Sequence, residues 1–388
     1  MYKLIKNEII KQIKKKKNLV MMLLFILVTV MFNLYGVKEI SNQKRFDDNK
    51  VFINNLNMQL TTSKSDKEKD DIKNKIKEME RINKQLKFNI DNEKLDWKVL
   101  AKKKIVSYEN NIKNLDKNTD KQNIEMLNLQ KEKYEHCLKN NIDPSKSKGI
   151  NKTIKVMLLV TMFFLPIFIV VMISDIISGE YNPMTIRSLL VRPVSKTKIY
   201  LSKFIAANII IIVFFTLVMV ANLLIRGFMN GFESPFMLNI VGTRYKENLV
   251  QGISVVESSS YLMPLWKVFI SSLFLEWLYI ICSVSFIVMV SIITKNSMLS
   301  MGISSIVCVI FAMSINLILR GASHVTRAIC SVMFPIFFSG GSIVNGELSR
   351  LLLLPNISFT YSVVLLLAET LLFYVIGTLV FKRKNSYV

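Results

Sequence analysis

Six apolar stretches, each close to the roughly 20 residues that cross a bilayer as a helix, constrain most strongly what this chain can fold into. They occupy residues 19–35, 156–174, 204–225, 268–294, 298–319 and 359–381. The chain has 388 residues, of which 51% are hydrophobic, and its apolar residues gather in these blocks. The sequence therefore predicts an all-α membrane protein with six transmembrane helices.

Basic residues flank the first and last of these stretches. Lysines crowd residues 3–17, and Lys382, Arg383 and Lys384 follow the final stretch. Short cytoplasmic segments are enriched in Lys and Arg, so we expect both termini to be cytoplasmic. The net charge of +23 then indicates contact with membrane lipid and predicts no nucleic-acid partner.

The first 17 residues have the pattern of an amphipathic helix. One helical face carries Tyr2, Ile5, Ile9 and Ile13, with lysines around the remainder. A helix of this kind lies in the plane of a membrane surface. We expect residues 1–17 to form a cytoplasmic elbow helix before a first span at 18–36, although a merely basic topogenic tail is the alternative.

Residues 37–152 differ in composition from the rest of the chain. They are rich in Lys, Asn, Asp and Glu, nearly free of Gly and Pro, and carry apolar residues near heptad spacing. These seam residues are Ile72, Ile76, Met79, Leu86, Ile90, Trp97 and Leu100. Capping boxes at 65–68 and 119–122 indicate about four helices, although two long helices would also return the chain to the membrane. We predict an extracellular, coiled-coil-like helical domain between the first two spans.

The sequence contains no catalytic or metal-binding pattern. Its four cysteines have no paired spacing, and its two histidines are isolated from other ligand residues. No G-x-x-x-x-G-K phosphate loop occurs anywhere in the chain. We expect this chain not to be an enzyme, and to bind no metal and no cofactor itself.

Residues 178–203 form a basic loop between the second and third apolar stretches. Asn182 can cap a helix that starts at Pro183, and Pro193 stops that helix because it biases the preceding residue away from helical geometry. Arg187 and Arg192 add positive charge beside the membrane, as in a cytoplasmic loop. We expect one exposed helix between two sharp stops; an ordinary basic loop is the alternative.

This loop resembles the coupling loop of ABC-2-type exporter permeases. The resemblance rests on a Glu, a Thr-bearing turn, a Leu-Leu pair and Arg-Pro-Val-Ser, followed by a basic residue at the start of an apolar helix. These residues are Glu180, Thr185, Leu189, Leu190, Arg192, Pro193, Val194, Ser195 and Lys203. Met184 departs from the family pattern, which usually has a small residue before the Thr. The resemblance implies that an ATPase is coupled through Glu180, Thr185, Arg187, Leu189, Leu190, Arg192 and Pro193.

The resemblance also implies an architecture and partners. It implies a five-span permease core at 153–388 with extracellular half-helices at 328–355. The partners would be a cytosolic ABC ATPase dimer, which binds ATP and Mg, and a second permease subunit in a homodimer or heterodimer. The protein would be a multi-pass exporter of the bacterial cytoplasmic membrane, and its cargo a peptide, an antibiotic or a lipid-like amphiphile.

Two carboxylates lie inside apolar stretches. Glu276 is in the fourth stretch and Glu369 in the sixth. A carboxylate at hydrocarbon depth is costly, so it is buried against protein, neutralised or placed on a water-filled path. Both are candidates to line the translocation path, and an interhelical hydrogen bond from a protonated carboxyl is the alternative.

A non-transporting cell-envelope protein is the alternative function. A scaffold or receptor of the secretion-accessory or phage-infection kind could share the order of one span, a long helical ectodomain and a cluster of spans. Such a scaffold has no need of a proline-bounded basic helix at the cytosolic face. The loop at 178–203 therefore favours the permease.

Overall fold

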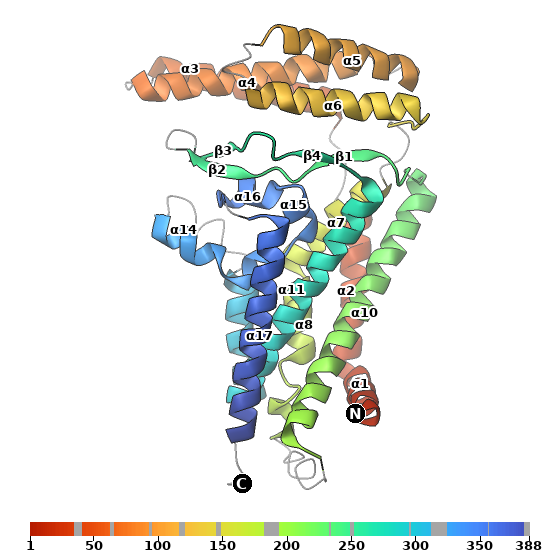
Figure 1. Cartoon of the computed structure of the whole chain (residues 1–388), viewed down its shortest axis with the longest axis vertical. Coiled ribbons are helices and arrows are strands. Elements are labelled where there is room, and N and C mark those ends of the chain that lie inside the picture. Colours follow the sequence, from red (N-terminus) through yellow and green to blue (C-terminus); the bar gives the residue numbers. More distant parts are fainter. Residues whose placement is uncertain are drawn as a thin grey trace. The chain divides into compact units, whose positions relative to one another are not determined.

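The computed structural model of the chain is mostly helical (Figure 1). It describes residues 1–34, 41–62, 66–92, 95–115, 121–144, 149–181, 194–232, 234–248, 252–294, 296–311, 324–355 and 357–383. The chain divides into two compact units. The smaller is Lys38–Ser107, and the larger combines Met1–Val37 with Tyr108–Val388.

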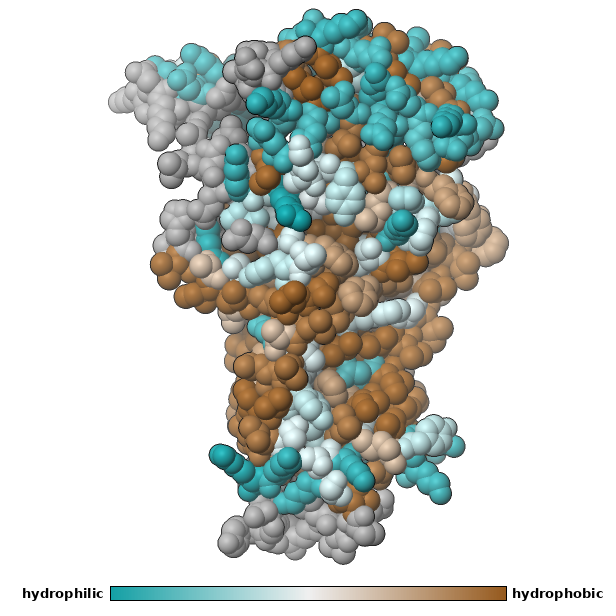
Figure 2. Space-filling model, viewed as in Figure 1, coloured by the Kyte–Doolittle hydropathy of each residue, from teal (hydrophilic) through white to brown (hydrophobic). Residues whose placement is uncertain are grey.

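Long apolar helices dominate the larger unit. Four in the described part of the chain are long and apolar enough to cross a membrane: α2 (Lys16–Leu34), α10 (Lys196–Asn230), α11 (Leu265–Thr294) and α17 (Phe359–Arg383). Hydrophobic side chains cover much of the surface of this bundle in Figure 2. Leu217, Val364 and Leu371 are among the large hydrophobic residues that are exposed. So large an apolar surface suits lipid and not water.

A bent pair of helices is a candidate for a fifth span. The helices α7 (Gly149–Phe163) and α8 (Leu165–Ile173) together have the length and hydropathy of a span, but they meet at 51°. Pro166 explains the bend, because its ring lacks an N–H and clashes with the preceding turn. The chain then enters a short helix, η1 (Ser178–Glu180).

The predicted span at 298–319 is described only in its first part. Asn296 caps α12 (Ser297–Ser305) by accepting hydrogen bonds from the N–H groups of Met298 and Leu299. The helix continues through η2 (Ile306–Ile310). The rest of this stretch lies outside the described residues. Four to five spans are therefore seen, and the six-span layout stays a prediction.

Short helices lie between the last two apolar stretches. They are α14 (His324–Ser331), η3 (Phe334–Phe337), α15 (Gly340–Val344) and α16 (Glu347–Leu352). The α15 helix packs on α11 and α7. A Cβ on Gly340 would lie 2.3 Å from the Ser272 carbonyl oxygen, so this close approach requires a glycine.

Four short strands connect α10 to α11, and the sequence analysis did not predict them. The strand β1 (Leu238–Val241) pairs antiparallel with β4 (Tyr261–Pro264), and β2 (Tyr245–Asn248) pairs antiparallel with β3 (Gly252–Val255). Within the described residues each of these sheets has two strands. The predominantly α-helical class is confirmed, with this small addition.

Four helices occupy the segment predicted as a helical domain. They are α3 (Asn42–Thr62), α4 (Asp66–Asp91), α5 (Trp97–Lys113) and α6 (Lys121–Lys139). In the smaller unit α3 packs against α4, with Leu56 and Leu86 buried. The described residues of this segment thus form four helices and not two long ones; its predicted extracellular side stays a prediction.

The α6 helix belongs to the larger unit, where it packs on residues 238–264, the part of the chain that carries β1 to β4. We call these residues the strand segment. The Gln122 side chain donates a hydrogen bond to the Val255 carbonyl, and the Ser258 N–H donates to Glu125 Oε2 at 2.7 Å. These contacts attach the end of the 37–152 segment to the connection between α10 and α11.

Candidate functional site

A buried ion cluster joins three helices at the end of the bundle that carries the N terminus (Figure 1). At its centre is Lys203 of α10, whose side chain is only 1% exposed. Its Nζ lies 2.6 Å from Glu180 Oε1 and 3.0 Å from Glu8 Oε1. Lys11 also reaches Glu180 Oε1, at 2.5 Å. We call Glu8, Lys11, Glu180 and Lys203 the ion cluster.

The ion cluster is electrically balanced, with two carboxylates and two ammonium groups. Burying a charge without a partner is costly, so the three buried members specify one another's positions. Glu8 comes from α1, Glu180 from η1 and Lys203 from α10. The amphipathic helix α1 is therefore fixed to the rest of the bundle by charge as well as by its apolar face.

Two further ion pairs, both made by Asp175, hold the junction of α1 and α2. Asp175, which follows α8, lies 3.1 Å from Lys15 Nζ and 2.8 Å from Lys17 Nζ. Burial lowers the pKa of Lys15 below its usual value, although the neighbouring Asp175 carboxylate acts in the opposite direction. Lys15 and Lys17 thus bind the α1–α2 junction by charge to Asp175, just after α8.

Serine hydroxyls attach the same end of α8 to the later spans. Ser291 Oγ, on α11, accepts hydrogen bonds from the N–H groups of Ile177 and Ser178 at 3.3 and 2.9 Å. Ser300 Oγ, on α12, donates to the Ser174 carbonyl at 2.7 Å. The backbone just before residue 182 is therefore held by α1, α10, α11 and α12 together.

The other end of the predicted coupling loop is also anchored. Ser195 stands at the N-cap position of α10, without a side-chain capping hydrogen bond. One turn later the buried Tyr200 ring packs on Tyr374 and Phe381 of α17, with ring centroids 5.3 and 6.0 Å apart. A displacement of the loop would consequently be transmitted to the segments on both sides of it, the end of α8 and the start of α10.

The structure describes only one of the predicted coupling residues. Glu180 is 3% exposed and faces Lys203 and Lys11. Its carboxylate is therefore buried among the side chains of the ion cluster and is not exposed at the surface. Six further predicted coupling residues lie outside the described residues: Thr185, Arg187, Leu189, Leu190, Arg192 and Pro193.

Sequence reasoning missed the buried pairing of Glu8 with Lys203. Glu8 is the single acid in a segment otherwise full of lysines, and Lys203 stands at the start of a long apolar helix. Each is unusual in its surroundings, which is a weak signal for a buried pair. The 195 positions that separate them kept the pairing out of reach of any local pattern.

The two intramembrane carboxylates both contact the short helices between the last two apolar stretches. Glu276 is fully buried, and its Oε1 accepts a hydrogen bond from the Gly340 N–H at 2.9 Å, at the start of α15. Glu369 accepts a backbone hydrogen bond from Phe334, at the start of η3, and lies 3.9 Å from Cys282 Sγ. Glu276 thus faces protein and not an open path in this conformation.

Comparison with known proteins decides the family. A family model described as "ABC-2 family transporter protein" matches residues 2–386. The chain belongs to the ABC-2 transporter family. The match includes the helical segment at 37–152 and the strands, so both are part of an ABC-2 family protein and not an unrelated fusion. A search among curated proteins found no match to the chain.

Family membership gives the broad role of the molecule. An ABC-2 family chain is the permease of an ABC transporter, it crosses the membrane several times, and it works with an ABC ATPase. In the described residues no three His, Cys, Asp or Glu side chains form a group that could hold a metal ion.

Proposed function

We propose that this ABC-2 permease is the membrane subunit of an exporter, and that its 182–193 loop receives the force of a separate cytosolic ATPase. The observation that carries the proposal is the ion cluster with its surrounding bonds. A loop that transmits force needs rigid attachment at both ends, and Glu180 and Tyr200 provide it. The family match favours this permease role over the envelope scaffold.

Closure of the ATPase would push the loop, and the push would reach α8 through Glu180 and α10 through Lys203. Because the cluster also contains Glu8, α1 would move with them. In this proposal ATP and Mg bind the ATPase, and the chain itself catalyses no reaction. A second permease subunit would complete the translocation path, and the loop would lie on the cytoplasmic side of a bacterial cell membrane.

The proposed cargo is a peptide, an antibiotic or a lipid-like amphiphile. Glu276 and Glu369 bear on how the path opens. Glu276 holds the start of α15, and Glu369 holds the start of η3. Movement of α11 against α17 would therefore move these short helices as well. Their proposed role is to link the short helices to the spans, and contact with cargo would follow only after such a movement.

Substitutions in the loop test the proposal. Leu189→Asp and Arg192→Glu should abolish co-purification of the ATPase while membrane insertion stays normal. Lys198→Glu is the matched control, because it reverses a charge on the neighbouring α10 outside the predicted docking residues. Normal ATPase binding by both loop variants would contradict the proposed docking site.

A further inference from the structure

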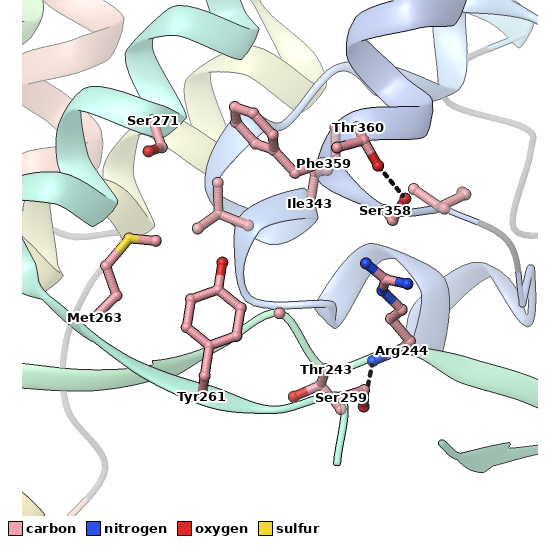
Figure 3. Close-up of a pocket in the computed structure, with 13 residues that line it drawn as sticks. Thr243, Arg244, Ser259, Tyr261, Met263, Ser271, Ile343, Ser358, Phe359 and Thr360 are labelled. Atoms are coloured by element: carbon pink, nitrogen blue, oxygen red, sulfur yellow. Dashed lines mark hydrogen bonds between the residues drawn. The ribbon is translucent and has the colours of Figure 1, made fainter. Parts of the chain in front are cut away.

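A cavity of about 230 Å³ lies in the larger unit, between the strand segment and the start of α17 (Figure 3). Arg244 and Tyr261 extend into it from the strand segment, and Ser358 and Thr360 face it from the helical side. Among the described residues no Asp or Glu lines it. It therefore offers a guanidinium and several hydroxyls without a competing carboxylate.

These groups suit a phosphate. Arg binds phosphate oxygens with its planar fork of N–H donors, and hydroxyls donate the further hydrogen bonds that an anion needs. The first turn of α17, which begins at Phe359, adds a positive electrostatic potential on the side opposite Arg244. On the apolar side of the cavity, Met263 and Ile343 provide hydrocarbon contacts.

The walls are held in place by close backbone contacts. The Gly242 N–H donates to the Val344 carbonyl at 2.9 Å, which joins the strand segment to α15. Gly242 has a φ of +76°, and a Cβ there would lie 2.3 Å from the Tyr261 ring. Gly242 thus lets the ring stand at the cavity wall, and the site is preformed.

The cavity lies at the level where two apolar spans begin. α11 starts at Leu265 and α17 at Phe359. Trp266 and Phe359 at these starts are 39% and 37% exposed, and Lys267 Nζ lies 5.5 Å from the centre of the Trp266 ring. Exposed aromatic and basic side chains at the ends of spans are typical of the headgroup layer of a bilayer. The cavity therefore lies at the depth expected for lipid headgroups.

We propose that this cavity binds the headgroup of an anionic phospholipid, with its phosphodiester held by Arg244 and by the hydroxyls of Tyr261, Ser358 and Thr360. The volume of about 230 Å³ is below the range of about 300–1,000 Å³ typical of sites that enclose a drug-sized ligand. The cavity thus takes the headgroup and the first acyl carbons, and the chains remain in the bilayer. This site is independent of the proposed coupling loop.

Native mass spectrometry of the detergent-purified full chain tests the proposal. With equal amounts of phosphatidylglycerol and phosphatidylcholine added, the native chain should retain phosphatidylglycerol preferentially, because the choline cation of phosphatidylcholine would meet Arg244 in a cavity without a carboxylate. Arg244→Gln should weaken that retention by about tenfold, the loss expected for one charge-assisted hydrogen bond. Thr360→Glu should do the same by repulsion, and it should fold normally because an acid is favourable in the first turn of α17.

Lys246→Gln is the matched control, since Lys246 is a basic residue of the same strand segment outside the cavity lining. It should retain the lipid like the native chain. Equal retention of the two lipids by the native chain, or unchanged retention in Arg244→Gln, would overturn the proposal. Glycerol 1-phosphate that displaces the lipid at equal concentration would also overturn it, because the site would then serve a free phosphate. An acidic peptide that displaces the lipid at equal concentration would overturn the proposal as well, because the site would then serve a peptide.

Discussion

Replacing Lys203 by methionine should destabilise the larger unit severely. The change keeps an unbranched side chain that is one atom shorter, but it leaves Glu8 and Glu180 without their shared buried ammonium group. Lys203 is 1% exposed and its contacts are 2.6 and 3.0 Å long, so it belongs to the class of fully buried pairs. Removing one partner of such a pair costs about 3–5 kcal/mol.

Lys11→Met is the matched control. Lys11 contacts the same Glu180 oxygen, but its side chain is 44% exposed. Water screens an exposed pair, so this loss should cost about 1 kcal/mol or less. The double variant Lys203→Met with Glu180→Gln should recover part of the stability, because it leaves Glu8 and Lys11 with balanced charges.

The free energy of unfolding, measured in mixed detergent micelles, checks both expectations. Equal losses in Lys203→Met and Lys11→Met would refute the reasoning, because burial would then not determine the cost. A double variant less stable than Lys203→Met alone would refute it too.

Three further predictions concern other parts of the chain. Gly340→Ala should destabilise the protein by about 1–3 kcal/mol, because its Cβ would clash with the Ser272 carbonyl; the control Gly302→Ala, with nothing within 4 Å, should be neutral or stabilising in thermal unfolding. Replacing residues 38–107 with a Gly/Ser linker should leave the unfolding midpoint of the larger unit unchanged, whereas a deletion that extends to 144 should lower it by removing the contacts of α6 with the strands. A cysteine at Asp48 should react with an impermeant reagent in intact cells and one at Ser195 only after lysis, against a low background because the four native cysteines are buried; the reverse labelling would contradict the predicted topology.

Local patterns predicted much of the membrane part. Hydropathy over about 20 residues locates a span because each span satisfies its own backbone hydrogen bonds, whatever its neighbours are. The bend at Pro166 follows from one ring that lacks an N–H. The capping boxes likewise indicated about four helices at 37–152, since a cap is made within a few residues, although two long helices remained open from the sequence.

Contacts between distant residues were beyond such patterns. The bond of Lys203 to Glu8 and that of Gly340 to Glu276 each join separate helices, and no spacing in the sequence encodes them. The strands at 238–264 were missed for a related reason. Each has only four residues, too few for a clear alternation of apolar and polar side chains, and β1 finds its partner β4 only through the fold.

Site-specific photo-crosslinking tests the central claim most directly. A photoreactive amino acid at Leu189 should crosslink to a soluble ABC ATPase in cells, whereas the same group at Thr243, in the strand segment, should not. This result would show that the 182–193 loop docks the ATPase. No crosslink at Leu189, or equal crosslinking at both positions, would contradict the account.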